Sequence, residues 1–302
     1  MRAMQPTRSL HSTMKRRTEA AVISFVKAHA CGNDFLILEE DAAGRGHAEL
    51  ARMLCARNTG IGADGIEFLD RSGTRPGDFF LRLFNADGSE AELSGNGTRC
   101  VAAWLAFSEG ITQVALGTHG GLRTCRVVES AGTAYLIESG MGVPRVMPRT
   151  IRLADIGDVE GAMVNVGNPH FVLFVETDDF SAHGICWQEL GAKISSSPVF
   201  PHGTNVEFVR VHSKDEIAFR IFERGCGPTM SSGTGTCAAS AAAMSLRGTS
   251  RELRAIAEGG AQRTVWPAAD SEMLLTGPAE IVCRGEALQQ QPEHIPAEAH
   301  SL

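Results

Sequence analysis

An internal repeat constrains this chain more than any other feature. Two stretches, SGNGTRCVAAWL (94–105) and SGTGTCAASAAA (232–243), share the pattern S-G-x-G-T followed by an alanine-rich run that favours a helix. A phenylalanine stands at the same distance before each serine, Phe84 in the first copy and Phe222 in the second. Repeats of this kind predict two related structural units, each with a helix that begins at its S-G-x-G-T loop.

Further matches lie upstream of the two loops, in the same order. Glu67-Phe68 corresponds to Glu207-Phe208, and residues 32–35 (GNDF) correspond to residues 167–171 (GNPHF). Most intervening segments have the β-branched and aromatic composition of strands: 78–84, 122–129, 171–175, 205–211 and 216–222. Helical patterns are fewer, at 48–58 and after Thr98 and Thr236. The sequence therefore predicts an α/β (α+β) fold in which each half is a β-rich unit.

The repeat also predicts how the chain divides. The segment MGVP (141–144) is the expected crossing point between the halves, and the strand-like run 272–283 is expected to return to the first half. We therefore expect a first domain of residues 23–141 plus 270–285 and a second domain of residues 142–269. Residues 1–22 and 286–302 have the composition of a disordered extension and a disordered tail.

Composition and charge exclude several classes of protein. The 302-residue chain has a formal net charge of −7, which argues against a nucleic-acid partner. No apolar run approaches the roughly 18–20 residues of a membrane span, so no membrane partner is expected. None of the eight cysteines forms a C-x-x-C pair, and neither a metal site nor a cofactor is predicted. Unpaired thiols without a secretory leader are typical of a cytoplasmic protein.

The two loops have the chemistry of an anion site. A Gly-x-Gly turn at a helix start leaves backbone N–H groups unpaired at the positive end of the helix dipole, which suits a carboxylate or a phosphate. Neither loop carries the lysine of a P-loop, which argues against a nucleotide. A pseudo-twofold axis between the halves would bring both helix ends to one cleft. We therefore expect a small carboxylate to bind between them.

Polar residues near the repeats extend this prediction to a zwitterion. Taken singly, each is typical of a turn or of a solvated surface. Together they offer amide groups, one carboxylate and one guanidinium, which match the ammonium and carboxylate groups of an amino acid. The residues are Asn33, Asn85, Asn168, Asn205, Glu223 and Arg224.

At these residues the chain resembles diaminopimelate epimerase, from about residue 24 to residue 284. The matching motifs stand in family order: KAHACGNDF, GIGADG, FNADGSEAELSGNGTRC, VNVGNPHF, GTNVEF and FERGCGPTMSSGTGTCA. The resemblance implies two pseudo-symmetric domains, each a barrel-like sheet around a central helix, with the active site in the cleft between them. It also implies a cytosolic, often dimeric enzyme that interconverts LL- and meso-diaminopimelate without a cofactor such as pyridoxal phosphate.

The resemblance assigns roles to individual residues. The polar residues above would hold mainly the distal, unreacting end of the substrate. Backbone N–H groups of the loops would bind the reacting α-carboxylate, at Gly95, Asn96, Gly233 and Thr234. In the family a cysteine precedes each Gly-x-Gly, and the two thiols exchange protons with opposite faces of the α-carbon. Here Ser94 and Ser232 occupy both catalytic positions.

This departure changes the energetics of proton transfer. A thiol with a pKa of ~8.5 costs about 2 kcal/mol to ionise at pH 7, and an alcohol with a pKa of roughly 15–16 costs about 9–10 kcal/mol more. A helix N-terminus offsets only about 1–2 kcal/mol. A hydroxyl therefore needs another base to accept its proton. By family analogy the candidate auxiliary residue is His170, and Glu90 or Glu92 can also approach.

The cysteines near the loops are not expected to replace the missing thiols. Cys100 and Cys237 lie within the predicted helices, where we expect them to be buried. Cys226 lies near the second loop and is not a usual family feature.

Three functions remain open at this point. The first is a diaminopimelate epimerase of lysine and cell-wall precursor synthesis. The second is a lyase or dehydratase of the same superfamily, which needs an acid/base group on one face only. The third is a catalytically silent protein that binds diaminopimelate or another amino acid. The sequence reads the same whether the two serines are native or engineered.

Overall fold

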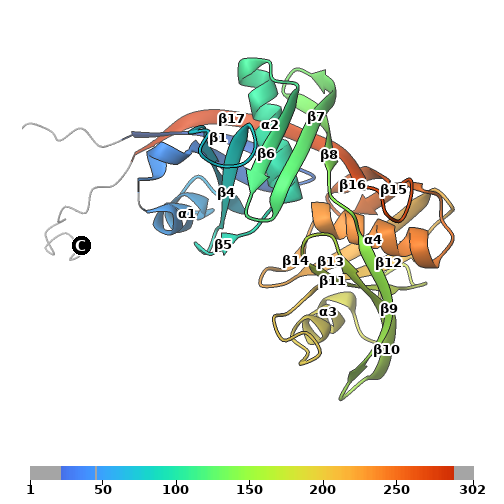
Figure 1. Ribbon diagram of the computed structural model, residues 1–302. Coiled ribbons are helices and arrows are strands. Elements are labelled where there is room, and N and C mark those ends of the chain that lie inside the picture. Colours follow the sequence, from blue (N-terminus) through green and yellow to red (C-terminus); the bar gives the residue numbers. More distant parts are fainter. Residues whose placement is uncertain (1–21, 45, 289–302) are drawn as a thin grey trace, which may run out of the picture.

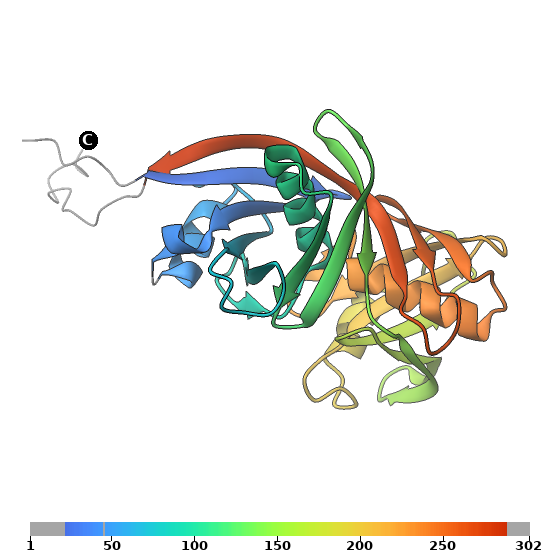
Figure 2. The same ribbon diagram turned by 45° about the horizontal axis from the view of Figure 1, so that its top comes forward.

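The computed structural model describes residues 22–44 and 46–288, which form two lobes (Figure 1). The first lobe contains β1 to β8 and the second contains β9 to β16. β17 (Leu274–Leu288), the long red strand, runs along both lobes, as the second view also shows (Figure 2). Most of the two segments predicted to be disordered, residues 1–21 and 289–302, lies outside the described residues.

Eight strands of the first lobe close into a barrel. The pairing runs from β1 through β2, β3, β4, β6, β7 and β8 to β17, and β17 pairs back with β1. Only the β2–β3 and β4–β6 pairings of this ring are parallel. The strands are β1 (Val22–Ala30), β2 (Asn33–Glu39), β3 (Gly65–Asp70), β4 (Phe79–Asn85), β6 (Gln113–Thr118), β7 (Gly121–Ala131) and β8 (Ala134–Gly140), with β5 (Glu90–Ala91) beside β4.

The second lobe repeats this order of pairing. β10 pairs with β11, β11 with β12, β12 with β13, β13 with β15, β15 with β16 and β16 with β17. The parallel pairs, β11–β12 and β13–β15, stand at the equivalent places. The predicted duplication into two α/β units is confirmed. The strands are β9 (Arg145–Leu153), β10 (Gly157–Asn165), β11 (Pro169–Phe174), β12 (Asn205–Val211), β13 (Glu216–Glu223), β14 (Gly227–Thr229), β15 (Glu252–Ala257) and β16 (Gly260–Val265).

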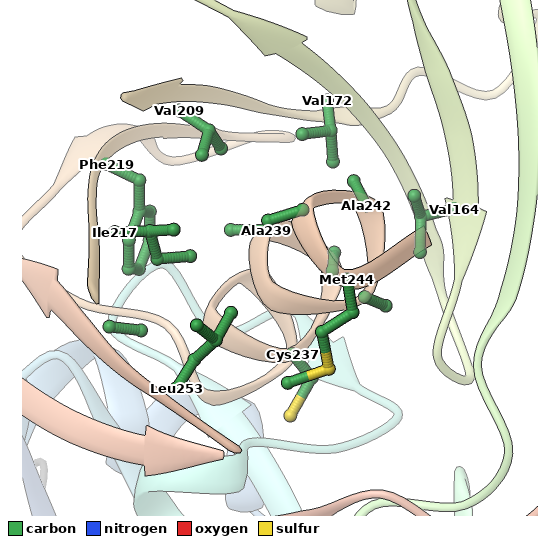
Figure 3. Packing of buried hydrophobic residues seen from close by; sticks show 14 of the residues in the cluster. Val164, Val172, Val209, Ile217, Phe219, Cys237, Ala239, Ala242, Met244 and Leu253 are labelled. Carbon is green, nitrogen blue, oxygen red and sulfur yellow. The ribbon is translucent and has the colours of Figure 1, made fainter. Parts of the chain in front are cut away.

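Each sheet surrounds one central helix, α2 (Gly95–Glu109) in the first lobe and α4 (Gly233–Leu246) in the second. α4 is apolar on every side and buried along most of its length, as expected of a helix inside a core. Its alanines let the strands approach closely. Cys100 and Cys237 are both fully buried, which confirms the prediction for them. Figure 3 shows the packing of α4 residues Cys237, Ala239, Ala242 and Met244 among Val164, Val172, Val209, Ile217, Phe219 and Leu253.

Two further helices cover the outside of the sheets. α1 (His47–Cys55) buries Leu50 and Leu54 against residues of β2 and β3, and the short η1 (Glu40–Ala43) precedes it. α3 (Trp187–Ser195) does the same in the second lobe with Leu190 and Ile194. The sequence predicted α1 slightly too long, at 48–58, and missed α3. The nine residues of α3 contain a central glycine, which weakens the local helical preference.

Residues 141–144 connect β8 of the first lobe to β9 of the second. Residues 280–288 of β17 pair with β1, the first strand of the first lobe. β17 extends three residues into the segment predicted as a disordered tail, and β1 begins at Val22, one residue earlier than the predicted domain start. None of the helices described is both long enough and apolar enough to cross a membrane.

Candidate active site

Each central helix begins at the serine of an S-G-x-G loop. Ser94 is the N-cap of α2, and its Oγ accepts a hydrogen bond from the Gly97 N–H at 3.0 Å. Ser232 caps α4 in the same way, with 3.3 Å between its Oγ and the Gly235 nitrogen. The first N–H groups of a helix have no preceding helical turn whose carbonyls could accept their hydrogen bonds. The N–H groups of the first two residues of each helix therefore stay available for a ligand.

The two loops meet at their first glycines. A Cβ added to Gly95 would lie 3.2 Å from the Cα of Gly233, and a Cβ added to Gly233 would lie 3.0 Å from the Cα of Gly95. Side chains at these positions would push the loops apart, which explains both glycines. The positive ends of two helix dipoles therefore converge on one place, an arrangement that favours a bound anion.

A cavity of about 650 Å³ opens at these loops and is lined by both lobes. Residues from both copies of the repeat, far apart in the sequence, meet in this cavity. Every site residue predicted from the sequence except His170 lines it: Asn33, Asn85, Ser94, Gly95, Asn96, Asn168, Asn205, Glu223, Arg224, Ser232, Gly233 and Thr234.

Strand ends place the asparagines of the first lobe at this cavity. Asn33 is the first residue of β2 and Asn85 is the last residue of β4. Two hydrogen bonds fix the orientation of the Asn33 amide: its Nδ2 donates to Asp64 Oδ2 at 2.7 Å, and its Oδ1 accepts from Asn96 Nδ2 at 3.0 Å. The Asn85 Nδ2 donates to the Ser89 hydroxyl at 3.0 Å.

Strand ends of the second lobe contribute the counterpart set. Asn205 opens β12, and its Oδ1 accepts a hydrogen bond from the backbone N–H of Arg224 at 2.9 Å. The guanidinium of Arg224 is held at the rim by a hydrogen bond to the carbonyl of His202 at 3.1 Å. Arg224 is therefore a positioned cation at one end of the cavity.

His170 lies behind the cavity wall and not in it, with 1% of its surface exposed. Its Nδ1 lies 2.6 Å from Glu207 Oε1, and its Nε2 lies 2.8 Å from Asn168 Oδ1. Asn168 Nδ2 donates to Thr234 Oγ1 at 3.3 Å, and that hydroxyl lies 3.4 Å from Ser232 Oγ. A chain of hydrogen bonds thus connects the buried Glu207–His170 pair to Ser232.

Glu223 lies near the Ser232 hydroxyl, a neighbour that the sequence did not predict for it. Burial raises the pKa of its carboxyl, and the nearby hydroxyls of Thr229 and Ser232 offset part of that shift. The Thr229 hydroxyl donates to Glu223 Oε1 at 2.6 Å. The sequence placed Glu223 among the ligands of the substrate. Its equivalent in the first half is Asn85, and this difference was the available signal for a special role.

Arg99 is a residue that sequence reasoning missed. Its guanidinium is fully buried beneath the first loop and donates to the Gly95 carbonyl at 3.2 Å and to Asn96 Oδ1 at 2.5 Å. Asn96 in turn donates to the carbonyl of Ser231 in the opposite lobe at 3.2 Å. Arg99 therefore helps to hold the two loops together, and it adds positive charge beneath them.

The other candidate bases around the cavity are poorly suited to serve the serines. Glu90 accepts a hydrogen bond from Arg82 at 2.9 Å, which lowers the pKa of the carboxyl and weakens it as a base. Burial raises the pKa of the Cys226 thiol, so this thiol stays protonated at neutral pH. Within residues 22–44 and 46–288, no three His, Cys, Asp or Glu side chains converge as a metal site requires.

Comparison with known proteins places this geometry in a family. A family model described as diaminopimelate epimerase matches residues 25–147 and 162–282. Diaminopimelate epimerase 1 of Nostoc sp. strain PCC 7120 is 37% identical over 286 residues, which covers 87% of this chain and 99% of that protein. The diaminopimelate epimerase of Trichodesmium erythraeum is 36% identical over 279 residues and covers 87% of this chain and 98% of its own length.

Solved structures share the fold at lower sequence identity. A hydroxyproline epimerase from Agrobacterium vitis with bound trans-4-hydroxy-L-proline superposes with a TM-score of 0.67 at 15% identity, covering 90% of this chain and 94% of that one. A Bacillus anthracis phenazine biosynthesis protein of the PhzF family gives 0.66 at 16% identity, covering 89% and 100%. These likenesses show the fold, and the sequence matches show more: the chain belongs to the diaminopimelate epimerase family of isomerases.

Proposed function

We propose that the protein is a diaminopimelate epimerase that interconverts LL- and meso-diaminopimelate without a cofactor. The observation that carries the proposal is the pairing of Ser94 and Ser232 at one cavity, each at the N-terminus of a central helix. Inversion at a carbon needs a proton acceptor on one face and a proton donor on the other. The duplicated fold offers one hydroxyl from each lobe for these two roles.

The converging helix ends would hold the reacting α-carboxylate. The backbone N–H groups of the four loop residues would donate to its oxygens, and the buried charge of Arg99 would add to the attraction. The same groups would stabilise the negative charge that develops when the α-proton leaves. The four loop residues are Gly95, Asn96, Gly233 and Thr234.

The distal end of the substrate carries its own ammonium and carboxylate. Arg224 at the rim would pair with the distal carboxylate, and the amides of Asn85, Asn168 and Asn205 would complete its hydrogen bonds. Asn33, whose orientation is fixed by Asp64, would contact an amino group through its remaining acceptor capacity. These assignments rest on the lining of the cavity and on the family to which the chain belongs.

Glu223 would make Ser232 a workable base. The Ser232 Oγ would take the α-proton while its own proton passes to the Glu223 carboxylate, so that no free alkoxide forms. The raised pKa of Glu223 favours this role, because a base works best when its pKa lies near the operating pH. The hydrogen-bonded chain from His170 would keep Thr234 and Ser232 oriented.

We further propose that the enzyme acts in the cytoplasm as a homodimer, in lysine and cell-wall precursor synthesis. Family membership supports the pathway and the dimer. The eight cysteines of the chain are all unpaired, which supports a reducing compartment. Light scattering after gel filtration tests the assembly: a mass of twice 32.2 kDa supports a dimer, and 32.2 kDa contradicts it.

The difference between the two lobes favours one second candidate, a lyase or dehydratase. The last residue of β13 is the carboxylate Glu223, whereas the equivalent last residue of β4 is the amide Asn85. Elimination needs strong acid/base assistance on one face only, and this asymmetry would suit it.

Incubation of the purified protein with LL-diaminopimelate, followed by chiral chromatography, separates these functions. Formation of the meso isomer supports the epimerase. Release of ammonia and a 2-oxo acid from hydroxylated amino acids, without epimerisation, favours the lyase. Binding of diaminopimelate in calorimetry without any product indicates a silent binding protein and contradicts both enzymatic proposals.

A further inference from the structure

Against the first loop lies a buried carboxylic acid, one of whose oxygens has no hydrogen-bond partner in the described part of the chain. Glu67, in the middle of β3, is 1% exposed, and its Oε1 has no hydrogen-bond partner among residues 22–44 and 46–288. Its carboxyl packs on the first turn of α2 so closely that a Cβ on Gly97 would collide with it. Gly97 is also the residue whose N–H donates to Ser94 Oγ. The carboxyl and the serine hydroxyl therefore contact the same glycine.

The second lobe contains the same carboxyl with a partner. Glu207 occupies the equivalent place on β12, and its Oε1 would lie 3.1 Å from a Cβ added to Gly235. It is bound to His170, which faces Asn205 in the β11–β12 register. In the β2–β3 register the equivalent place, opposite Gly65, is taken by the phenyl ring of Phe35. The strands therefore align one residue away from the sequence match, which had paired Phe35 with Phe171. Glu67 lacks a partner because the first copy of the repeat has no histidine there.

The first lobe also has no counterpart of Glu223, the carboxylate proposed to assist Ser232 in the second lobe. Glu223, which faces Ser232, is replaced by Asn85 at the end of β4, and an amide does not accept a proton. A buried carboxyl without a partner destabilises the fold, and a leucine would fill the space at no such cost. Burial raises the pKa of Glu67 to about 8, which places its titration in the range useful for catalysis.

We propose that Glu67 is the proton partner of Ser94, a positioning residue that acts on the substrate only through the serine hydroxyl. This inference rests on the proposed function. When Ser94 donates to the α-carbon, the Ser94 O–H bond breaks and the Cα–H bond forms. In the same step the Glu67 O–H bond breaks and a new Ser94 O–H bond forms, so that no free alkoxide appears and a carboxylate is left at Glu67. Because Glu67 Oε1 has no hydrogen-bond partner among the described residues, this transfer requires the carboxyl and the Ser94 hydroxyl to come within hydrogen-bond distance in the substrate complex. In the reverse direction the carboxylate accepts the Ser94 proton as Ser94 Oγ removes the α-proton.

The two lobes then use different acids for the same task. Glu223 and Ser232 both line the cavity, whereas Glu67 is buried inside the barrel and would reach the substrate only through Ser94. Loss of Glu67 should therefore slow proton transfer at one face of the α-carbon and leave proton transfer at the other face unchanged.

Exchange of the α-proton for solvent deuterium, followed from the LL and the meso isomer separately, tests this face selectivity. We expect Glu67→Gln to slow exchange from one isomer by on the order of 100-fold, to leave the other within about twofold, and to abolish inversion. Glu109→Gln, at the exposed far end of α2, should change neither rate. Equal slowing of exchange from both isomers indicates a merely structural role for Glu67 and overturns the proposal.

A second measurement does not depend on turnover. The difference between infrared spectra of the wild-type protein and the Glu67→Gln variant, taken over a pH series, reports the titration of the Glu67 carboxyl. We expect Ser94→Ala to shift its midpoint and Ser232→Ala to leave it unchanged. A midpoint unaffected by Ser94→Ala overturns the proposal even in an active enzyme. A wild-type protein that exchanges no α-proton contradicts the proposed function alone.

Discussion

The burial of Glu67 predicts a distinctive pH dependence of stability, which the Glu67→Leu variant should lack. In the folded protein burial raises the pKa of this carboxyl from 4.5 to about 8, whereas in the unfolded chain it ionises near 4.5. Between these values the folded protein retains a proton that the unfolded chain has released. The free energy of unfolding of the wild-type protein therefore falls as the pH rises through this window.

The size of this effect follows from the shift. Each pH unit in the window lowers the free energy of unfolding by roughly 1.4 kcal/mol, which amounts to about 5 kcal/mol over the whole window. About 3.5 kcal/mol of this falls between pH 5 and pH 8. This is a large fraction of the roughly 5–15 kcal/mol that stabilises a typical domain. The leucine variant has no proton to retain and should be the more stable protein at pH 8.

Urea unfolding of both proteins at half-unit steps from pH 5 to pH 8 measures this difference. All other titrating groups are common to the two proteins, so the difference between the two curves reports Glu67. We expect the variant to gain about 3.5 kcal/mol relative to the wild type across this range. Parallel curves would refute the reasoning, because they would show that Glu67 has the same pKa in the folded and unfolded states.

Three further predictions concern the cavity. Ser94→Cys combined with Ser232→Cys should raise the epimerase rate by orders of magnitude, because a thiol ionises about 9–10 kcal/mol more readily than an alcohol; an unchanged rate would show that the pocket serves another reaction. Gly95→Ala should weaken substrate binding at least tenfold in calorimetry, because its Cβ would lie 3.2 Å from the backbone of the opposite loop; unchanged affinity would place the carboxylate elsewhere. Thr229→Val removes a hydrogen bond to the ionised form of Glu223, so the acidic limb of the pH–rate profile should move to higher pH; an unmoved limb would assign it to another group.

The duplicated fold can be predicted from the sequence because it leaves two independent traces. The S-G-x-G-T loops mark the helix starts, and the Glu-Phe pairs at 67–68 and 207–208 mark equivalent strands. The four asparagines singled out in the sequence all line the cavity, and they lie at or beside strand ends next to glycine-containing turns. α3 escapes prediction because its anchors Trp187, Leu190 and Ile194 span only two turns.

The proton partners of the serines cannot be predicted in this way. The sequence shows that Glu67 and Glu207 are equivalent, but not that one meets a histidine and the other a phenyl ring across a parallel strand pair. The position of Glu223 near Ser232 depends on the hairpin between β13 and β14, across which the hydroxyl of Thr229, the last residue of β14, donates to the Glu223 carboxyl. His170, the auxiliary residue expected by analogy, reaches the cavity only through intermediate side chains.

The central claim is that Ser94 and Ser232 act on opposite faces of one substrate. Deuterium exchange in the Ser94→Ala and Ser232→Ala variants, measured separately from LL- and meso-diaminopimelate, tests it most directly. We expect each variant to retain exchange from one stereoisomer, the two variants to retain opposite ones, and neither to invert the substrate. Inversion that survives in either variant, or loss of exchange from the same stereoisomer in both, would contradict the claim.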